Sequence, residues 1–126
     1  MSEQAAHEFI EALQVLERDS DPQPLVDRYA GDCEVGNLTA TSTFRGEDGA
    51  RRFWLGHREL FADVQSEFHN VIVDDGRAAL EWTISGHAQD GAEVRFSGVT
   101  LLEYRDNLII RSMAYFDPHQ LGRQLL

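Results

Sequence analysis

Residues 65–116 read QSEFHNVIVDDGRAALEWTISGHAQDGAEVRFSGVTLLEYRDNLIIRSMAYF, and they determine the fold class. Apolar and polar side chains alternate along this stretch, which is the pattern of half-buried strands. Three turn dipeptides divide it: Asp75-Gly76, Asp90-Gly91 and Asp106-Asn107. Glycine in the first two accepts the positive φ of a tight hairpin turn. We therefore predict four consecutive antiparallel strands, at 65–73, 77–89, 92–105 and 108–116.

The residues upstream of this meander favour helices. In the segment 4–18, Phe9, Leu13 and Leu16 recur at helical spacing on one face. A short helix can begin at Pro24, an irregular strand is expected at 33–41, and a third helix at 49–62 with Asp48 as its N-cap. A last short helix is expected at 117–126. Helices followed by a meander predict an α+β domain with the helices on one face of the sheet.

Composition restricts the class of partner. The chain of 126 residues has a formal net charge of −11, contains 11 arginines and no lysine, and has one cysteine, Cys33. Such an acidic surface repels phosphate groups, so neither nucleic acid nor a membrane is expected as a partner. A single cysteine excludes an internal disulfide and a cysteine-rich zinc site. No signal peptide is apparent at the N-terminus, so we expect one cytoplasmic domain over 1–126.

Turn lengths predict which side chains share a face of the sheet. If every turn has two loop residues, Trp82 lies opposite His69 and Val99, and Val99 lies opposite Ala114. The more apolar face, expected to pack on the helices, then carries His69, Val71, Leu80, Trp82, Ile84, Val99, Leu101, Glu103, Ile110, Ser112, Ala114 and Phe116. The other face is mixed in character and suits a homodimer interface that includes Glu81, Thr100, Arg111, Met113 and Tyr115, with Glu81 and Arg111 as possible partners.

Several short motifs, in order along the chain, carry a resemblance to a known family. They are Phe9-x-x-Ala12-Leu13, Leu25-x-x-x-Tyr29-Ala30-x-Asp32, Phe44-x-Gly46, Ala50-x-x-Phe53-Trp54, Ala79-Leu80-Glu81-Trp82-Thr83-x-x-Gly86, Leu102-Glu103-Tyr104-Arg105-Asp106 and Ala114-Tyr115-Phe116-Asp117-Pro118. The chain resembles the nuclear transport factor 2-like superfamily in its SnoaL-like, polyketide cyclase-like branch. The resemblance implies a cone-shaped curved antiparallel sheet wrapped around the N-terminal helices, as in cystatin-like and SnoaL-like α+β barrels. It also implies a pocket between the concave face and the first and third helices, and dimerisation through the convex face.

The same resemblance allows catalytic roles to be tested residue by residue. The general base of ketosteroid isomerases would fall at Asn37, and their two oxyanion donors near Phe9 and Val99. None of these residues can perform its role, so steroid isomerisation is not expected. The resemblance to polyketide cyclases implies acid–base side chains that project from the strands into the pocket. His69 and Glu103 are the titratable residues that the predicted register places on that face, so they are the catalytic candidates.

Two function classes remain. The first is a small-molecule-binding domain, with or without cofactor-free isomerase, cyclase or dehydratase activity on an apolar carbonyl compound. Its ligand-binding residues would be Phe9, Leu13, Tyr29, Asn37, Trp54, Leu80, Trp82, Val99, Leu101, Ser112, Ala114 and Phe116. Tyr29 and Asn37 would be the polar anchors, and no metal or organic cofactor is expected. The second class is an accessory or assembly domain whose interior is filled.

Overall fold

The computed structural model describes residues 2–38 and 43–117. Within these residues, two helices and two strands are followed by a third helix and four long strands. They are α1 (Ser2–Asp19), α2 (Gln23–Val26), β1 (Tyr29–Asn37), β2 (Phe44–Arg45), α3 (Gly46–Glu59), β3 (Phe61–Asp74), β4 (Arg77–Ala88), β5 (Glu93–Arg105) and β6 (Leu108–Phe116). The predicted helix at 117–126 lies outside the described residues, apart from Asp117.

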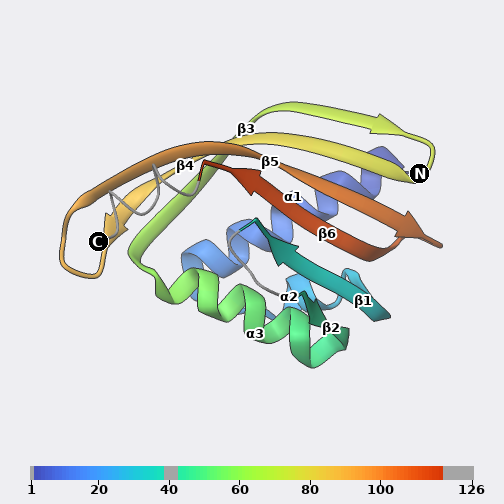
Figure 1. Ribbon diagram of the computed structural model, residues 1–126, viewed down its shortest axis with the longest axis horizontal. Coiled ribbons are helices and arrows are strands. Elements are labelled where there is room, and N and C mark those ends of the chain that lie inside the picture. The colour runs from blue at the N-terminus through green and yellow to red at the C-terminus, as the bar shows by residue number, and fades with distance from the viewer. Residues whose placement is uncertain (1, 39–42, 118–126) are drawn as a thin grey trace.

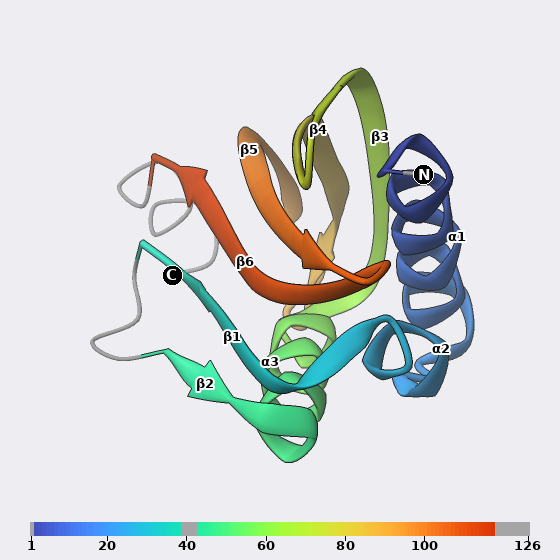
Figure 2. The same ribbon diagram turned by 90° about the vertical axis from the view of Figure 1, so that its right-hand side faces the viewer.

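The strands form one curved, open sheet in the order β2-β1-β6-β5-β4-β3. All neighbours are antiparallel except β1 and β6, which run parallel. The long strands bend over α3, while α1 runs alongside β3 (Figures 1 and 2). The predicted α+β class with a curved sheet around N-terminal helices is confirmed, and the sheet remains unclosed.

Two glycines allow the sheet to bend. A Cβ atom at Gly86 would lie 2.1 Å from the Asp63 carbonyl oxygen. One at Gly98 would lie 2.4 Å from the Tyr115 carbonyl oxygen and 2.7 Å from the Trp82 ring. No side chain larger than hydrogen fits at such separations, so the strands approach more closely here than an ordinary sheet permits.

The turn between β4 and β5 is one residue longer than predicted, and this changes the register of β5. Ala88 and Ala92 close a three-residue loop, in which the Ala88 N–H donates to the Ala92 carbonyl at 2.9 Å. Gly91, with φ of 90°, occupies the left-handed position that such loops require. Trp82 therefore lies opposite Gly98 rather than Val99. Because side chains alternate along a strand, this one-residue difference reverses every side chain of β5.

The prediction for the faces of β5 was accordingly wrong. Thr100 and Leu102 point inward and are buried, with 7% and 0% of their surface exposed. Val99, Leu101 and Glu103 belong to the outer face, where Leu101 is 38% exposed. The other two turns have the predicted two-residue loops, Asp75-Gly76 and Asp106-Asn107.

Two β-bulges account for the remaining differences in register. A bulge between Phe68 and Asn70 places Phe68 opposite Trp82, where the sequence predicts His69. A second irregularity, between Glu103 and Tyr104, shifts β6 by one residue against β5. This shift offsets the longer β4–β5 turn. Ser112, Ala114 and Phe116 therefore face inward as predicted, opposite Leu102, Thr100 and Gly98. The prediction for Ile110 was wrong, because Ile109 is the residue that the irregularity places in the core, with 0% of its surface exposed.

The third helix starts three residues before its predicted position. Gly46, with φ of 71°, turns the chain from β2 directly into α3, so Arg45 and not Asp48 is the N-cap. The helix ends at Glu59, and Gln89 Nε2 donates at 2.9 Å to the carbonyl oxygens of both Glu59 and Phe61. That contact joins residues about 30 positions apart, so the local sequence does not reveal this helix end.

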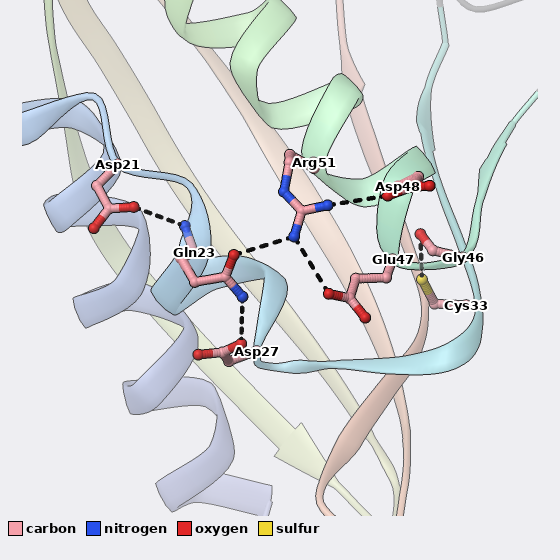
Figure 3. Close-up of polar contacts among 8 residues, drawn as sticks. All are labelled: Asp21, Gln23, Asp27, Cys33, Gly46, Glu47, Asp48 and Arg51. Carbon is pink, nitrogen blue, oxygen red and sulfur yellow. Dashed lines mark hydrogen bonds and ion pairs between the residues drawn. The ribbon is translucent and has the colours of Figure 1, made fainter.

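A polar network fixes the N-terminal end of α3 against α2 (Figure 3). Arg51 donates to Asp48 at 3.1 Å, to Glu47 at 3.3 Å and to the Gln23 side-chain oxygen at 3.1 Å. Gln23 in turn donates to Asp27 at 2.7 Å. These bonds are solvent-exposed and individually weak, but together they fix the position of the helix that carries Trp54.

Adjacent leucines on β5 test the corrected register. Leu102→Ala removes a fully buried side chain, so the free energy of unfolding should fall by about 2–5 kcal/mol. Leu101→Ala, the matched control on the outer face, should change it by less than about 1 kcal/mol. Urea unfolding of both variants measures the difference, and the register predicted from two-residue turns requires the opposite order.

Candidate functional site

A cavity of about 110 Å³ lies between the concave face of the sheet, α1 and α3. Its walls are mostly apolar and aromatic. The lining residues are Phe9, Leu13, Gly36, Asn37, Phe53, Trp54, His57, Leu60, Phe61, Ser66, Phe68, Trp82, Ile84, Phe96, Thr100, Ser112, Ala114 and Phe116.

Edge-to-face ring contacts hold the aromatic walls in place. On the helical side, the Trp54 ring centre lies 6.0 Å from that of Phe9 and 5.0 Å from that of Phe53. On the sheet side, Phe96 packs against Trp82 at 5.7 Å and against Phe116 at 5.6 Å. Such contacts restrict ring rotation, so the apolar walls are formed before any ligand binds.

A chain of hydrogen bonds connects α3 to β6 behind the wall. Trp54 Nε1 donates to the Tyr29 hydroxyl at 3.0 Å, and that hydroxyl lies 2.8 Å from Ser112 Oγ. Burial raises the pKa of Tyr29 far above its usual value, so its phenol is neutral at every physiological pH. Ser112 lines the cavity, whereas Tyr29 lies one layer behind it.

A second tryptophan orients a hydroxyl on the sheet side. Trp82 Nε1 donates to Thr100 Oγ1 at 2.8 Å. Both side chains are buried, with 5% and 7% of their surface exposed, and both line the cavity. The cavity thus contains two hydroxyl groups, on Ser112 and Thr100, that are each connected to an indole N–H.

A buried carboxyl group lies directly behind the cavity wall. The Glu17 carboxyl on α1 accepts the Ser66 backbone N–H at 3.1 Å and makes a second, short contact with Ser66 Oγ. Burial raises the pKa of Glu17, while the two Ser66 hydrogen bonds and the charge of Arg58 oppose the shift. Ser66 itself lines the cavity, so it connects Glu17 to the interior.

His57 is the titratable side chain on the wall itself. Its ring lies between those of Trp54 and Phe61, at 5.6 and 5.5 Å. Burial, assisted by the charge of Arg58, lowers the pKa of His57 from 6.5 to about 4. Within the described part of the chain, no hydrogen-bond partner of the ring is found. The imidazole is therefore neutral at pH 7 and faces an apolar space.

The structure brings together eight of the predicted ligand-binding residues. The residues that line the cavity are Phe9, Leu13, Asn37, Trp54, Trp82, Ser112, Ala114 and Phe116. Tyr29 lies behind them, and Leu80 is fully buried in the adjacent core. Val99 and Leu101 lie on the outer face because of the three-residue β4–β5 turn.

The two predicted catalytic residues lie outside the cavity. His69 Nε2 is 2.8 Å from the Thr83 hydroxyl on the outer face. Glu103 accepts from Arg111 Nη1 at 2.9 Å, directly across the β5–β6 pair. Glu103 therefore takes the place that Glu81 was expected to have beside Arg111. The bulge at His69 and the reversed β5 explain both positions.

Sequence reasoning missed three polar residues of the cavity: His57, Ser66 and Thr100. His57 follows Phe53 and Trp54 by four and three residues, so helical spacing places it on their face and was a usable signal. Ser66 has the same parity as Phe68, which the predicted register placed on the outer face, so Ser66 could be identified only with the bulge beside His69 known. Thr100 could be assigned to the cavity only once the true length of the β4–β5 turn was known.

Within the described segments, neither a metal site nor a membrane-spanning helix is found. Across residues 2–38 and 43–117, no three His, Cys, Asp or Glu side chains are grouped closely enough to hold a metal ion. Among the helices of the same segments, none has the length and apolar character needed to cross a membrane.

The fold is shared with solved structures of low sequence identity. TerC, co-crystallised with polyporic acid, matches with a TM-score of 0.81 and 17% identity over 96% of this chain and 98% of its own. An NTF2-like protein from Anabaena variabilis matches with a TM-score of 0.82 and 17% identity over 90% and 87%. TsrD from Streptomyces laurentii matches with a TM-score of 0.81 and 17% identity over 97% and 95%.

A comparison with curated protein sequences finds no match. The SnoaL-like domain model, in contrast, matches residues 6–112. That span runs from α1 into β6 and includes most of the cavity wall. The chain belongs to the SnoaL-like domain family.

Proposed function

We propose that this protein binds a compact, largely apolar small molecule in the cavity between α1, α3 and the sheet. The observation that carries the proposal is a preformed aromatic cavity with a few buried polar groups, which is the usual composition of a ligand site. The co-crystallisation of TerC, which has the same fold, with polyporic acid supports it.

The volume of the cavity limits the size of the ligand. Sites for drug-sized molecules usually measure about 300–1,000 Å³, whereas this cavity measures about 110 Å³. An engineered apolar cavity of about 150 Å³ binds benzene. This cavity is smaller than that but partly open to solvent, so the ligand we propose is about one ring in size, and a short substituent fits only if part of the ligand reaches the open side. The same small volume favours the second candidate function, an accessory or assembly domain with a filled interior.

The proposal is one of binding rather than of isomerase, cyclase or dehydratase chemistry. A general base works best when its pKa is near the pH of reaction. Among the lining residues that the structure describes, only His57 titrates between pH 2 and 9, and its pKa is about 4. Its neutral imidazole suits a hydrogen bond to a ligand better than removal of a proton at pH 7.

Native mass spectrometry of a cavity-filling variant tests the binding proposal. Ala114→Met places a long side chain in the cavity, and Ala92→Met is the matched control in the exposed β4–β5 turn. The wild type and the control should retain a small molecule from cell extract that Ala114→Met loses. If each of the three proteins is observed at the mass of its own polypeptide, with no retained molecule, the accessory domain is favoured.

The stability of the protein at acid pH tests the position of His57. Between pH 6.5 and 4 the unfolded chain binds a proton at His57 that the folded protein does not, so stability falls as pH falls through that range. His57→Gln removes this dependence. The wild type should lose about 3 kcal/mol relative to the variant between pH 7 and pH 4.

Urea unfolding of the wild type and His57→Gln at pH 7 and pH 4 measures this difference in stability. Glu17 is present in both proteins, so its contribution to the pH dependence cancels. His87→Gln is the matched control at an exposed position of β4. Its hydrogen bond to Asp63 raises the pKa of His87, so the wild type should gain stability relative to this control as pH falls. A wild type and His57→Gln with parallel pH profiles would contradict the burial of His57.

The outer face is proposed as a homodimer interface. It carries Glu81, Arg111, Met113 and Tyr115, as predicted, and the corrected register replaces Thr100 with Val99 and Leu101. Sedimentation at micromolar concentration should give twice 14.3 kDa. Leu101→Glu should give the monomer mass, and Gln4→Glu on α1, which changes the charge equally, should leave the dimer intact. A monomeric wild type would contradict the proposal.

A further inference from the structure

Two hydroxyl groups face the cavity from neighbouring strands. Thr100 on β5 and Ser112 on β6 have 7% and 4% of their surface exposed, and both line the cavity. Thr100 lies opposite Ala114, two residues along β6 from Ser112, so both side chains project from the same face of the sheet. What they offer a ligand depends on where their protons point.

The direction of the Thr100 hydroxyl follows from its partner. An indole N–H can only donate, so Thr100 Oγ1 accepts from Trp82 at 2.8 Å. The Thr100 proton is left to donate elsewhere. Within the described segments of the chain no acceptor for it is found, and the side chain faces the cavity. Thr100 therefore offers a donor to whatever occupies the cavity.

The direction of the Ser112 hydroxyl follows from two bonds in series. Tyr29 accepts the Trp54 N–H at 3.0 Å, again because indole can only donate. The Tyr29 proton is buried and requires an acceptor, since unpaired buried polar groups are costly. Ser112 Oγ, at 2.8 Å, provides that acceptor. The Ser112 proton is then free to donate, and Ser112, unlike Tyr29, lines the cavity.

We propose that Thr100 and Ser112 together donate hydrogen bonds to an acceptor oxygen of the ligand, so that the cavity selects a compact aromatic or unsaturated carbonyl compound over its hydrocarbon analogue. Tyr29 and Trp54 are positioning residues, which fix the direction of the Ser112 proton without touching the ligand. This inference rests on the proposed binding function. It replaces the expectation that Tyr29 contacts the ligand directly.

Three probes with one carbon skeleton separate this inference from binding in general. They are acetophenone with a carbonyl, 1-phenylethanol with a hydroxyl and ethylbenzene with neither. Affinities are measured by titration followed by NMR. Acetophenone should bind best and 1-phenylethanol less tightly, because a carbonyl oxygen accepts two hydrogen bonds without having to place a proton of its own. The carbonyl infrared band of bound acetophenone should lie at lower frequency than in hexane.

Isosteric variants identify the donors. Thr100→Val and Ser112→Ala should each weaken acetophenone binding about tenfold and change ethylbenzene binding by less than about twofold. Ethylbenzene binding also reports that the cavity of each variant is intact. Tyr29→Phe should weaken acetophenone binding about threefold. The carbonyl infrared band of bound acetophenone should then move part of the way back toward its frequency in hexane. Thr83→Val, the matched control on the outer face, should change neither affinity.

The outcomes distinguish failure of the donor pair from failure of the binding function. If ethylbenzene binds as tightly as acetophenone and Thr100→Val alters neither affinity, the donor pair is refuted while the binding function stands. If none of the three probes binds the wild type up to its solubility limit, the binding function and the donor pair both fail. A tenfold loss confined to acetophenone in both Thr100→Val and Ser112→Ala establishes the donor pair.

Discussion

Trp82 lies across the backbone of Gly98, and the concave face of this protein depends on that contact. A Cβ atom at Gly98 would lie 2.7 Å from the indole and 2.4 Å from the Tyr115 carbonyl oxygen. Because Gly98 has no Cβ atom, β4, β5 and β6 come close enough for the Trp82 indole to reach both Phe96 and Phe116. The same position brings the indole N–H to Thr100. The missing methyl group at Gly98 thus leaves the space on which the aromatic wall and the orientation of the Thr100 hydroxyl depend, and together with Gly86 it allows the sheet to bend.

The two tryptophans of the chain have parallel roles on opposite walls. Trp54 on α3 and Trp82 on β4 each present a ring to the cavity and direct the N–H toward a buried oxygen. An indole buried in this way satisfies its one polar group and keeps its apolar area available for packing. The cavity therefore combines rigid apolar walls with polar groups of defined direction, at little cost in unpaired hydrogen bonds.

The sequence predicted the fold class well because the signals for it are local. Period-two alternation and Asp-Gly turns identified the four long strands, and helical spacing identified α1. The orientation of β5 was not predictable, because Asp90-Gly91 suits both a two-residue and a three-residue turn. The bulge beside His69 leaves no signal in the chain either. Eight cavity residues were still identified, partly because the two register errors cancel on β6.

The three-residue turn and the bulges also affect how this chain can be aligned with its relatives. At 17% identity, an alignment has few matching residues to fix its gaps. A gap placed one position away on β5 exchanges the inward Gly98 and Thr100 for the outward Val99 and Leu101. Residue equivalences on β5 are therefore meaningful only when superposed strands, rather than matched letters, define them. Family-wide statistics of the cavity wall will otherwise mix interior positions with surface positions.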